Sequence, residues 1–299
     1  RNRSLELVPA DADICVCTDL DEYFTPGWRE QVESAWAEGA QQLRYPYVWS
    51  FNADGSEGTF FYADKMHARQ GFEWIHPVHE VLRYTGGGEA QRALCQGMRL
   101  EHHPDAQKSR AQYLPLLELA VQEAPQDDRS LHYLGREYLF HQRWNDCIAT
   151  LKRHLALPSA TWRDERCASM RYIARAYGAR GNAYEQECYL LRAAGEAPHL
   201  REPWLDLARM YYARQNWPGV AYACERALQI ADRPRTYMTE PESFGALPWD
   251  LLSIACYQLE QYPRAAQAAR EALRLAPQDA RIAENLRLME EKVECGAEE

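Results

Sequence analysis

The stretch Trp204-Leu205-Asp206-Leu207-Ala208-Arg209-Met210-Tyr211 is followed by Asn216-Trp217, and its pattern recurs along the chain. An aliphatic residue precedes a small one, and an aromatic residue stands three positions later. A small side chain lets two helices approach closely, and the ring fills the groove between them. The stretch therefore predicts a pair of packed helices. Altered copies are found at Leu134-Gly135-x-x-Tyr138, Ile173-Ala174-x-x-Tyr177 and Trp249-x-x-Leu252-Ser253.

The spacing of the copies identifies the type of repeat. Ile173 and Leu207 occupy equivalent positions, and their separation matches the period of about 34 residues of tetratricopeptide repeats. The flanking spacings are longer, with extra residues around 158–161 and 235–246. We therefore expect residues 105–295 to be an all-α, helical-hairpin solenoid.

The two ends of this region depart from the pattern. Residues 113–125 are expected to be the second helix of a degenerate repeat, and residues 281–293 a capping helix. The conspicuous aromatic residues between them are expected to pack in the repeat core. A solenoid has a concave face, which typically binds a protein or peptide partner.

Composition restricts the remaining possibilities. The chain has 299 residues, a net charge of −10 and a pI near 5.5, which argues against nucleic acid as the main partner. No apolar run approaches the roughly 18 residues of a transmembrane segment. The nine cysteines are scattered and odd in number, which indicates reduced thiols and a cytoplasmic protein.

An acidic cluster dominates residues 1–104. Residues 14–18 are apolar or small and suit a strand covered on both faces, after which Asp19, Asp21 and Glu22 follow. Alternate side chains of an Asp-x-Asp point the same way, and two carboxylates can hold Mg²⁺ or Mn²⁺. The alternative is a solvated acidic turn.

The rest of this region predicts an α/β layer. A helix is expected over residues 29–39 because its apolar residues share one face and a glycine ends it. Alternating aromatic and aliphatic residues predict strands. These expected strands cover residues 42–51, 59–67 and 89–102.

Polar residues embedded in an apolar strip add candidate chemistry. Glu80 is the first candidate for a general base that deprotonates an acceptor hydroxyl, and His79 is the next. Trp74 offers an apolar face to a sugar ring, or is a core residue. His102 ends an expected strand and is a candidate third metal ligand. The alternative for His79 and Glu80 is that they satisfy each other's hydrogen bonds.

Taken together, these residues resemble the C-terminal part of a family-2 glycosyltransferase domain of the A-type fold, fused to tetratricopeptide repeats. The resemblance rests on Arg1-Asn2, Thr18-Asp19-Leu20-Asp21-Glu22, Trp74 through His79-Glu80, Leu100-x-His102, and Lys108-Ser109-Arg110.

The resemblance implies a fold, a cofactor and a reaction. It implies an α/β part (1–104) followed by the all-α repeats. Asp19 and Asp21, beside Glu22, would hold Mn²⁺ or Mg²⁺ on the diphosphate of a nucleotide-sugar donor, and His102 would close the metal site. Glu80 would be the base of an inverting transfer, and His79 and Glu22 are the other candidates for this role.

The resemblance also implies that part of the catalytic domain is missing. Family members have a nucleotide-binding half before this point, and this sequence begins with Arg1 rather than Met. The parent protein is therefore expected to be active, and this fragment inactive.

We thus expect a metal-dependent glycosyltransferase that transfers a sugar to a glycan or protein acceptor, with repeats that recruit acceptor or partner. The first alternative is a non-enzymatic scaffold in which the repeats bind proteins and the α/β domain is vestigial. A weaker alternative is metal-dependent phosphoester hydrolysis.

Overall fold

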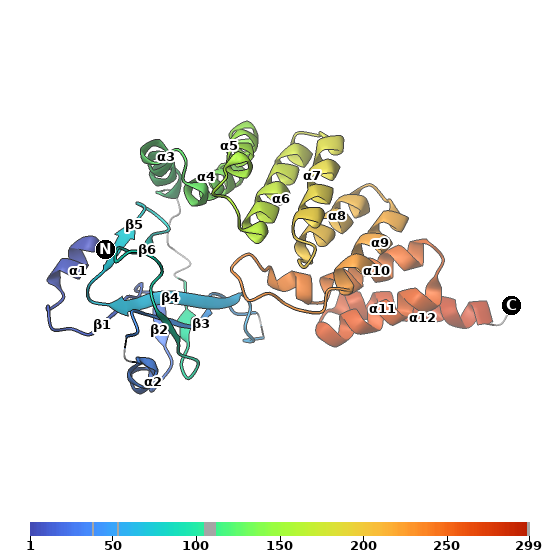
Figure 1. Ribbon diagram of the computed structural model, residues 1–299. Helices are drawn as coiled ribbons and strands as arrows, with labels where there is room; N and C mark the ends of the chain where they lie inside the picture. The colour runs from blue at the N-terminus through green and yellow to red at the C-terminus, as the bar shows by residue number, and fades with distance from the viewer. Residues whose placement is uncertain (38, 53, 105–111, 298–299) are drawn as a thin grey trace. The chain divides into compact units, whose positions relative to one another are not determined.

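The computed structural model describes the chain in two compact units (Figure 1). The described residues are all those of the sequence except 38, 53, 105–111 and 298–299. The first unit comprises Arg1–Pro125 with Arg235–Tyr237, and the second comprises Gln126–Pro234 with Met238–Glu299. The contacts thus divide the chain at Pro125, whereas the sequence predicted a boundary at residue 104. The predicted motif Lys108-Ser109-Arg110 lies outside the described residues.

The first unit is built on a six-stranded sheet in the order β1-β4-β3-β8-β2, with β7 beside β3. Three pairs of strands are antiparallel: β1 with β4, β3 with β4, and β2 with β8. Strands β7 and β8 each pair parallel with β3. The six strands are β1 Ile14–Val16, β2 Glu22–Phe24, β3 Gln42–Val48, β4 Phe60–Ala68, β7 Arg92–Leu94 and β8 Leu100–His102.

The core of this sheet lies under helix α2 (Trp28–Ala35). Leu43, Tyr45, Met66 and Leu100 are fully buried, and Val32 of α2 packs with them. The helix ends before Gly39, whose φ of +83° is left-handed and suits glycine. The predicted helix and the predicted strand over residues 42–51 are therefore present with shorter bounds.

One expectation about β1 is wrong. The sequence predicted a strand buried on both faces, but β1 is an edge strand and the side chain of Val16 is exposed. Only Cys15 of the strand is buried. The apolar residues mark a strand, but which neighbours cover it depends on distant pairing with β4.

A small hairpin forms a second sheet in this unit. Strands β5 (Phe72–Ile75) and β6 (Val81–Tyr84) pair antiparallel. The amide of Asn2, in helix α1 (Asn2–Leu7), exchanges two hydrogen bonds of 2.8 and 2.7 Å with the backbone of Trp74. These bonds fix the start of the chain against the hairpin. Helix α3 (Tyr113–Glu123) also belongs to this unit, as a helix in the predicted place.

The second unit is an array of antiparallel helix pairs and an end helix (Figure 1). Gly135 shows the close approach that the sequence predicted, because an added Cβ would overlap the side chain of Leu151. Asp127, Asn182 and Asn216 cap three helices by accepting from backbone N–H groups. The helices are α4 Asp128–Phe140, α5 Trp144–Ala156, α6 Arg163–Ala179, α7 Ala183–Glu196, α8 Glu202–Ala213, α9 Trp217–Leu228, α10 Leu247–Gln258, α11 Tyr262–Leu275 and α12 Ala280–Ala297.

The connection between α9 and α10 differs from the others. Elsewhere in the array, short turns join adjacent helices, as between α8 and α9 at residues 214–216. The connection between α9 and α10 extends over residues 229–246 and contains a 3₁₀ helix, Pro241–Phe244. Helix connections in bundles are usually 2–8 residues long. The extra residues that the sequence showed around 235–246 therefore form an ordered insert.

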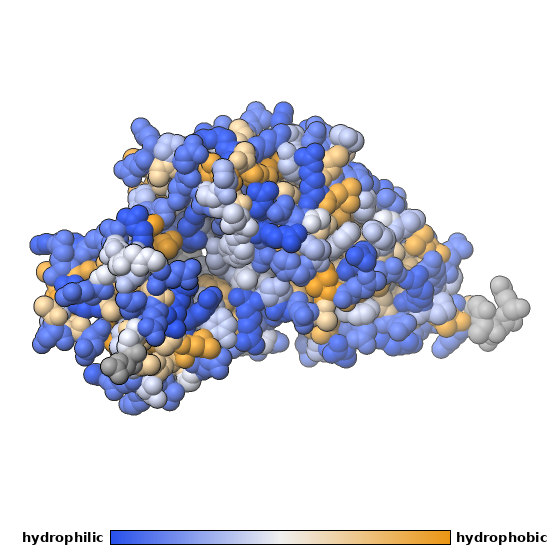
Figure 2. Space-filling model, viewed as in Figure 1, coloured by the Kyte–Doolittle hydropathy of each residue, from blue (hydrophilic) through white to orange (hydrophobic). Residues whose placement is uncertain are grey.

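Among the helices of the described residues, none combines the length and apolar character needed to cross a bilayer. Figure 2 shows that the visible face is mostly hydrophilic, with hydrophobic residues in small separate groups.

Candidate functional site

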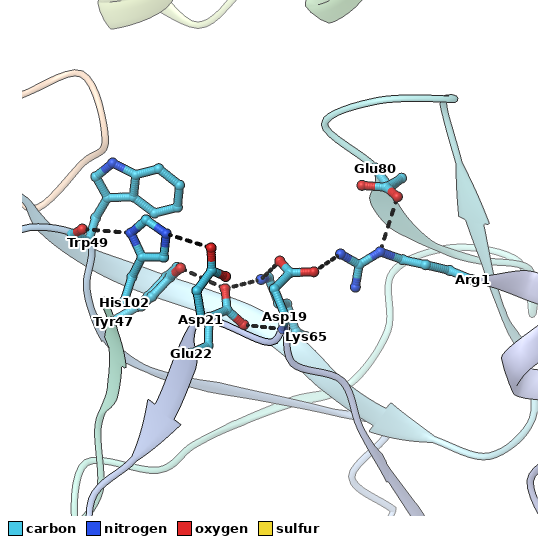
Figure 3. A network of polar contacts seen from close by, with 9 residues as sticks. All are labelled: Arg1, Asp19, Asp21, Glu22, Tyr47, Trp49, Lys65, Glu80 and His102. Carbon is cyan, nitrogen blue, oxygen red and sulfur yellow. Dashed lines mark hydrogen bonds and ion pairs between the residues drawn. The ribbon is translucent and has the colours of Figure 1, made fainter. Parts of the chain in front are cut away.

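The acidic cluster lies where the chain leaves β1 and enters β2. Glu22 begins β2 and pairs in register with His102 on β8. Sheet pairing therefore brings residues that are far apart in the sequence to one place. Figure 3 shows Asp19, Asp21, Glu22 and His102 together with several residues that the sequence analysis did not select.

His102 is oriented by three contacts with two residues, Trp49 and Asp21. Its Nδ1 lies 3.0 Å from the carbonyl oxygen of Trp49, and its ring stacks on the Trp49 indole with centroids 4.1 Å apart. Its Nε2 is 3.6 Å from Oδ2 of Asp21 (Figure 3). The structure thus brings together one of the two predicted carboxylate ligands and the predicted histidine.

Glu22 is buried and held by hydrogen bonds. Its Oε1 accepts from the Tyr47 hydroxyl and from Nζ of Lys65, each at 2.6 Å, and its Oε2 accepts from the backbone N–H of Asp19 at 2.9 Å. Burial, followed by the charge and hydrogen bond of Glu22, raises the pKa of Tyr47. The hydroxyl therefore stays protonated as a donor, and Glu22 anchors the turn that carries Asp19.

Asp19 lies between two cations. Its carboxylate forms ion pairs with Arg1 and, at 3.3 Å, with Nζ of Lys65. Arg1 also donates to Oε1 of Glu80 at 3.2 Å, so it bridges the two carboxylates (Figure 3). Burial acts to raise the pKa of Asp19, but Lys65 and Arg1 outweigh it and hold the pKa below its usual value.

This arrangement does not fit a metal site as it stands. Oxygens of Asp19 already face Arg1 and Lys65, and Asp19, Asp21 and His102 are not among the described side chains whose ligand atoms gather within 4.8 Å. A divalent ion there would have to displace two cations. The predicted metal site stays a prediction, and we derive no chemistry through a metal.

The one such group in the described part of the chain lies in the repeats, at His132, His154 and Glu165. The Ser169 hydroxyl is within 2.8 and 3.0 Å of Nδ1 of His132 and His154, and Nε2 of His154 lies 3.3 Å from Glu165. The Ser169 hydroxyl therefore links the two histidines, whereas Nε2 of His154 is buried and faces Glu165 without a hydrogen bond.

The residues predicted for base catalysis and sugar binding have other contacts in the structure. Glu80 pairs with Arg1, and the ring of His79 stacks on Tyr113 with centroids 5.6 Å apart. Trp74 is buried, and the Arg1 guanidinium lies 4.8 Å from its ring centroid. These contacts suit a structural role, and the predicted catalytic and binding roles stay predictions.

Sequence reasoning missed Arg1, Lys65 and Tyr47. Lys65 lies on β4, which pairs with β1, and Tyr47 lies on β3, which pairs with β8 beside β2. These pairings bring both residues near the acidic turn, which lies between β1 and β2. The sequence signal was the single lysine of this strand, next to Asp64.

A second charged site lies in the repeats, between α6, α7 and α8. A cavity of about 530 Å³ opens there, which we call the α6–α8 groove. Such a volume is typical of ligand sites. Its lining residues are Arg175, Gln186, Leu190, Asp206, Arg209, Met210, Ala213, Glu240 and Glu242.

Ion pairs connect α6 and α8 along one side of this groove. Arg171 of α6 is buried and donates to Oδ2 of Asp206 at 2.7 Å, and Arg175 contacts the same carboxylate at 3.1 Å. Burial acts to raise the pKa of Asp206, but these two arginines outweigh it and hold the pKa low. Asp206 therefore stays ionised between α6 and α8.

Comparisons with known proteins concern the repeats. No protein-family model matches the chain, and no curated protein matches it. The chain is similar to the crystal structure of MamA, at 15% identity over 56% of this chain and 89% of that one, with a TM-score of 0.45. It is also similar to TTC0263, a thermophilic TPR protein in Thermus thermophilus, at 18% identity over 59% and 88%, with a TM-score of 0.41. For yeast Tom70 the identity is 12%, over 63% of this chain and 37% of that chain, with a TM-score of 0.46.

At these identities the likeness concerns the fold alone. The helical part is a solenoid of packed helix pairs, as the sequence predicted. A sheet is present in the first unit, but the A-type glycosyltransferase fold is not confirmed.

The prediction of a glycosyltransferase is contradicted by these findings. The neighbours are repeat proteins, and neither a family model nor a curated protein supports the transferase resemblance. The sequence motifs that suggested the enzyme are short, and none of them alone is specific for that family.

Proposed function

We propose that this chain is a protein-interaction module whose repeat array binds a partner polypeptide in the α6–α8 groove. The observation that carries this proposal is the groove itself, a cavity of about 530 Å³ with charged walls and apolar side chains from Leu190 and Met210. An apolar floor with a few placed polar groups is the usual composition of a binding pocket.

The side chains around the groove are suited to a peptide. Arg175 and Arg209 present guanidinium groups, which form paired hydrogen bonds with carboxylates. Gln186 of α7 provides an amide that can donate to and accept from a peptide backbone. The groove thus offers charge, hydrogen bonds and apolar contact within one cavity.

A selection from a random peptide library on the purified chain tests this function. We expect enriched peptides whose binding is lost in Arg209→Glu and kept in Arg287→Glu. The two arginines are matched, because each is a partly exposed helix residue paired with a glutamate, but Arg287 lies on α12 outside the groove. Failure to enrich any peptide, or equal binding by the two variants, would refute the proposal.

A further inference from the structure

The insert between α9 and α10 makes contacts with the array that resemble those of a bound peptide. The backbone N–H of Glu240 donates to Oε1 of Glu202 at 2.9 Å, and the carbonyl of Ser243 accepts from Arg201 at 3.3 Å. Phe244 lies under the guanidinium of Arg201, 4.3 Å from the ring centroid. The array therefore recognises both the backbone and a side chain of this segment.

The two glutamates of the insert face the arginines of the groove. Oε1 of Glu240 is 2.9 Å from Nη2 of Arg171 and 3.6 Å from Nη2 of Arg175. Oε1 of Glu242 is 2.6 Å from Nη2 of Arg209. Both glutamates also line the cavity, so this segment fills one side of the groove and leaves the rest open.

Charge balance shows what the segment replaces. Arg171, Arg175 and Arg209 bring three positive charges, and α8 places the carboxylate of Asp206 among them and that of Glu202 near Arg171. Glu240 and Glu242 add two further carboxylates that pair with these arginines. Without the insert, the groove would therefore be more positive toward any ligand by two charges.

We propose that Glu240–Phe244 is a built-in occupant of the α6–α8 groove, and that the partner is an acidic polypeptide segment that displaces it. This inference rests on the proposed function and specifies its ligand. The partner would carry two carboxylates spaced as in Glu-x-Glu, because Glu240 and Glu242 are the groups of the insert that line the groove and pair with its arginines.

Because the insert is part of the same chain, it would regulate partner binding by competing for the groove. A tethered segment competes at an effective concentration on the order of millimolar, so a weak partner cannot displace it. The insert therefore raises the threshold for binding, and only a partner with additional contacts in the open part of the groove would replace it.

The test uses a fluorescein-labelled peptide with the sequence of residues 238–245 and measures its anisotropy with the purified chain. The variant Glu240→Gln/Glu242→Gln weakens the internal contacts and keeps the shape of the side chains. We expect this variant to bind the peptide at least about tenfold more tightly than the unchanged chain does, because the internal competitor is weakened. A peptide with both glutamates replaced by glutamine should lose binding to either chain.

A single variant, Glu242→Gln, guards against loss of folding, because Glu242 is more exposed than Glu240 and leaves the Arg171 contact intact. Its binding should be intermediate, and its circular dichroism should be unchanged. Equal peptide affinity for the variants and the unchanged chain would overturn the inference. If the library selection still yields peptides that need Arg209, the proposed function would stand while the built-in occupant would not.

Discussion

Replacing Gly135 by alanine tests the helix packing on which the repeat array depends. Two effects oppose each other in this variant. Alanine favours a helix over glycine by about 1 kcal/mol. Against this, the new Cβ would overlap Cδ2 and Cγ of Leu151, a side chain that is fully buried and cannot move into solvent.

The magnitude follows from the site. Overpacking of a well-packed core costs about 1–3 kcal/mol, and an overlap with both a terminal and a branching carbon places Gly135→Ala at the upper end. Subtracting the gain of about 1 kcal/mol in helix propensity leaves a net loss of about 2 kcal/mol. The matched control is Gly195→Ala in α7, where an added Cβ meets nothing within 4 Å. That variant should gain up to about 1 kcal/mol.

Urea denaturation followed by circular dichroism measures both variants. Because repeat arrays can unfold in stages, the midpoint and slope should be compared for each variant, and the slope should be unchanged. The variant Gly135→Ala/Leu151→Ala provides a double-mutant cycle, in which the cost of Gly135→Ala should largely disappear. If Gly135→Ala stabilised the chain as much as Gly195→Ala, the close approach of α4 and α5 would be wrong.

Three further predictions concern charges and turns. Asp206→Asn should destabilise the chain by about 3 kcal/mol at pH 7, since it removes a partner of buried Arg171. The folded-state pKa of Asp206 is lowered, so this difference in stability should be present above about pH 4 and vanish as pH falls through the folded pKa. Urea denaturation at several pH values measures it. Lys65→Met should strengthen Mn²⁺ binding measured by calorimetry, since it removes a competing cation from the carboxylates of Asp19 and Glu22, and unchanged binding would argue against a latent metal site. Gln215→Gly should stabilise the array by up to about 1 kcal/mol in thermal denaturation, since Gln215 has a φ of +56°, while the reciprocal Gly181→Gln (φ +73°) should destabilise it.

The repeats were predictable from the sequence because their contacts are local and periodic. Gly135, Ala174 and Ala208 stand where two helices touch, and within each copy the aliphatic, small and aromatic residues have the same spacing. Each hairpin closes between neighbours in the chain, so a pattern of aliphatic, small and aromatic residues is enough to predict it. The insert at residues 235–246 was visible as an excess of length, but its contacts with the groove were not.

The acidic cluster shows the opposite case. The pairing of Glu22 with His102 brings these two regions together, yet β2 itself was missed because Asp19, Asp21 and Glu22 suggested only a turn. The hairpin of β5 and β6 was missed too, since His76 and His79 adopt left-handed backbone angles where a sequence would normally signal glycine. Partners such as Lys65 come from distant strands, and no local pattern records them.

The two charged sites differ in how their charges are fixed, and this difference bears on function. At the acidic cluster, Lys65 and Glu22 lie on strands of the same sheet, which holds their backbones at a fixed separation. In the α6–α8 groove, Glu240 and Glu242 belong to a connection between helices, and their removal would leave the helix pairs intact. Ionic contacts that can be exchanged without unfolding are the ones available to a ligand, because the ligand needs to offset only the lost contacts and not the fold. This reasoning favours the repeat groove as the site where a partner binds.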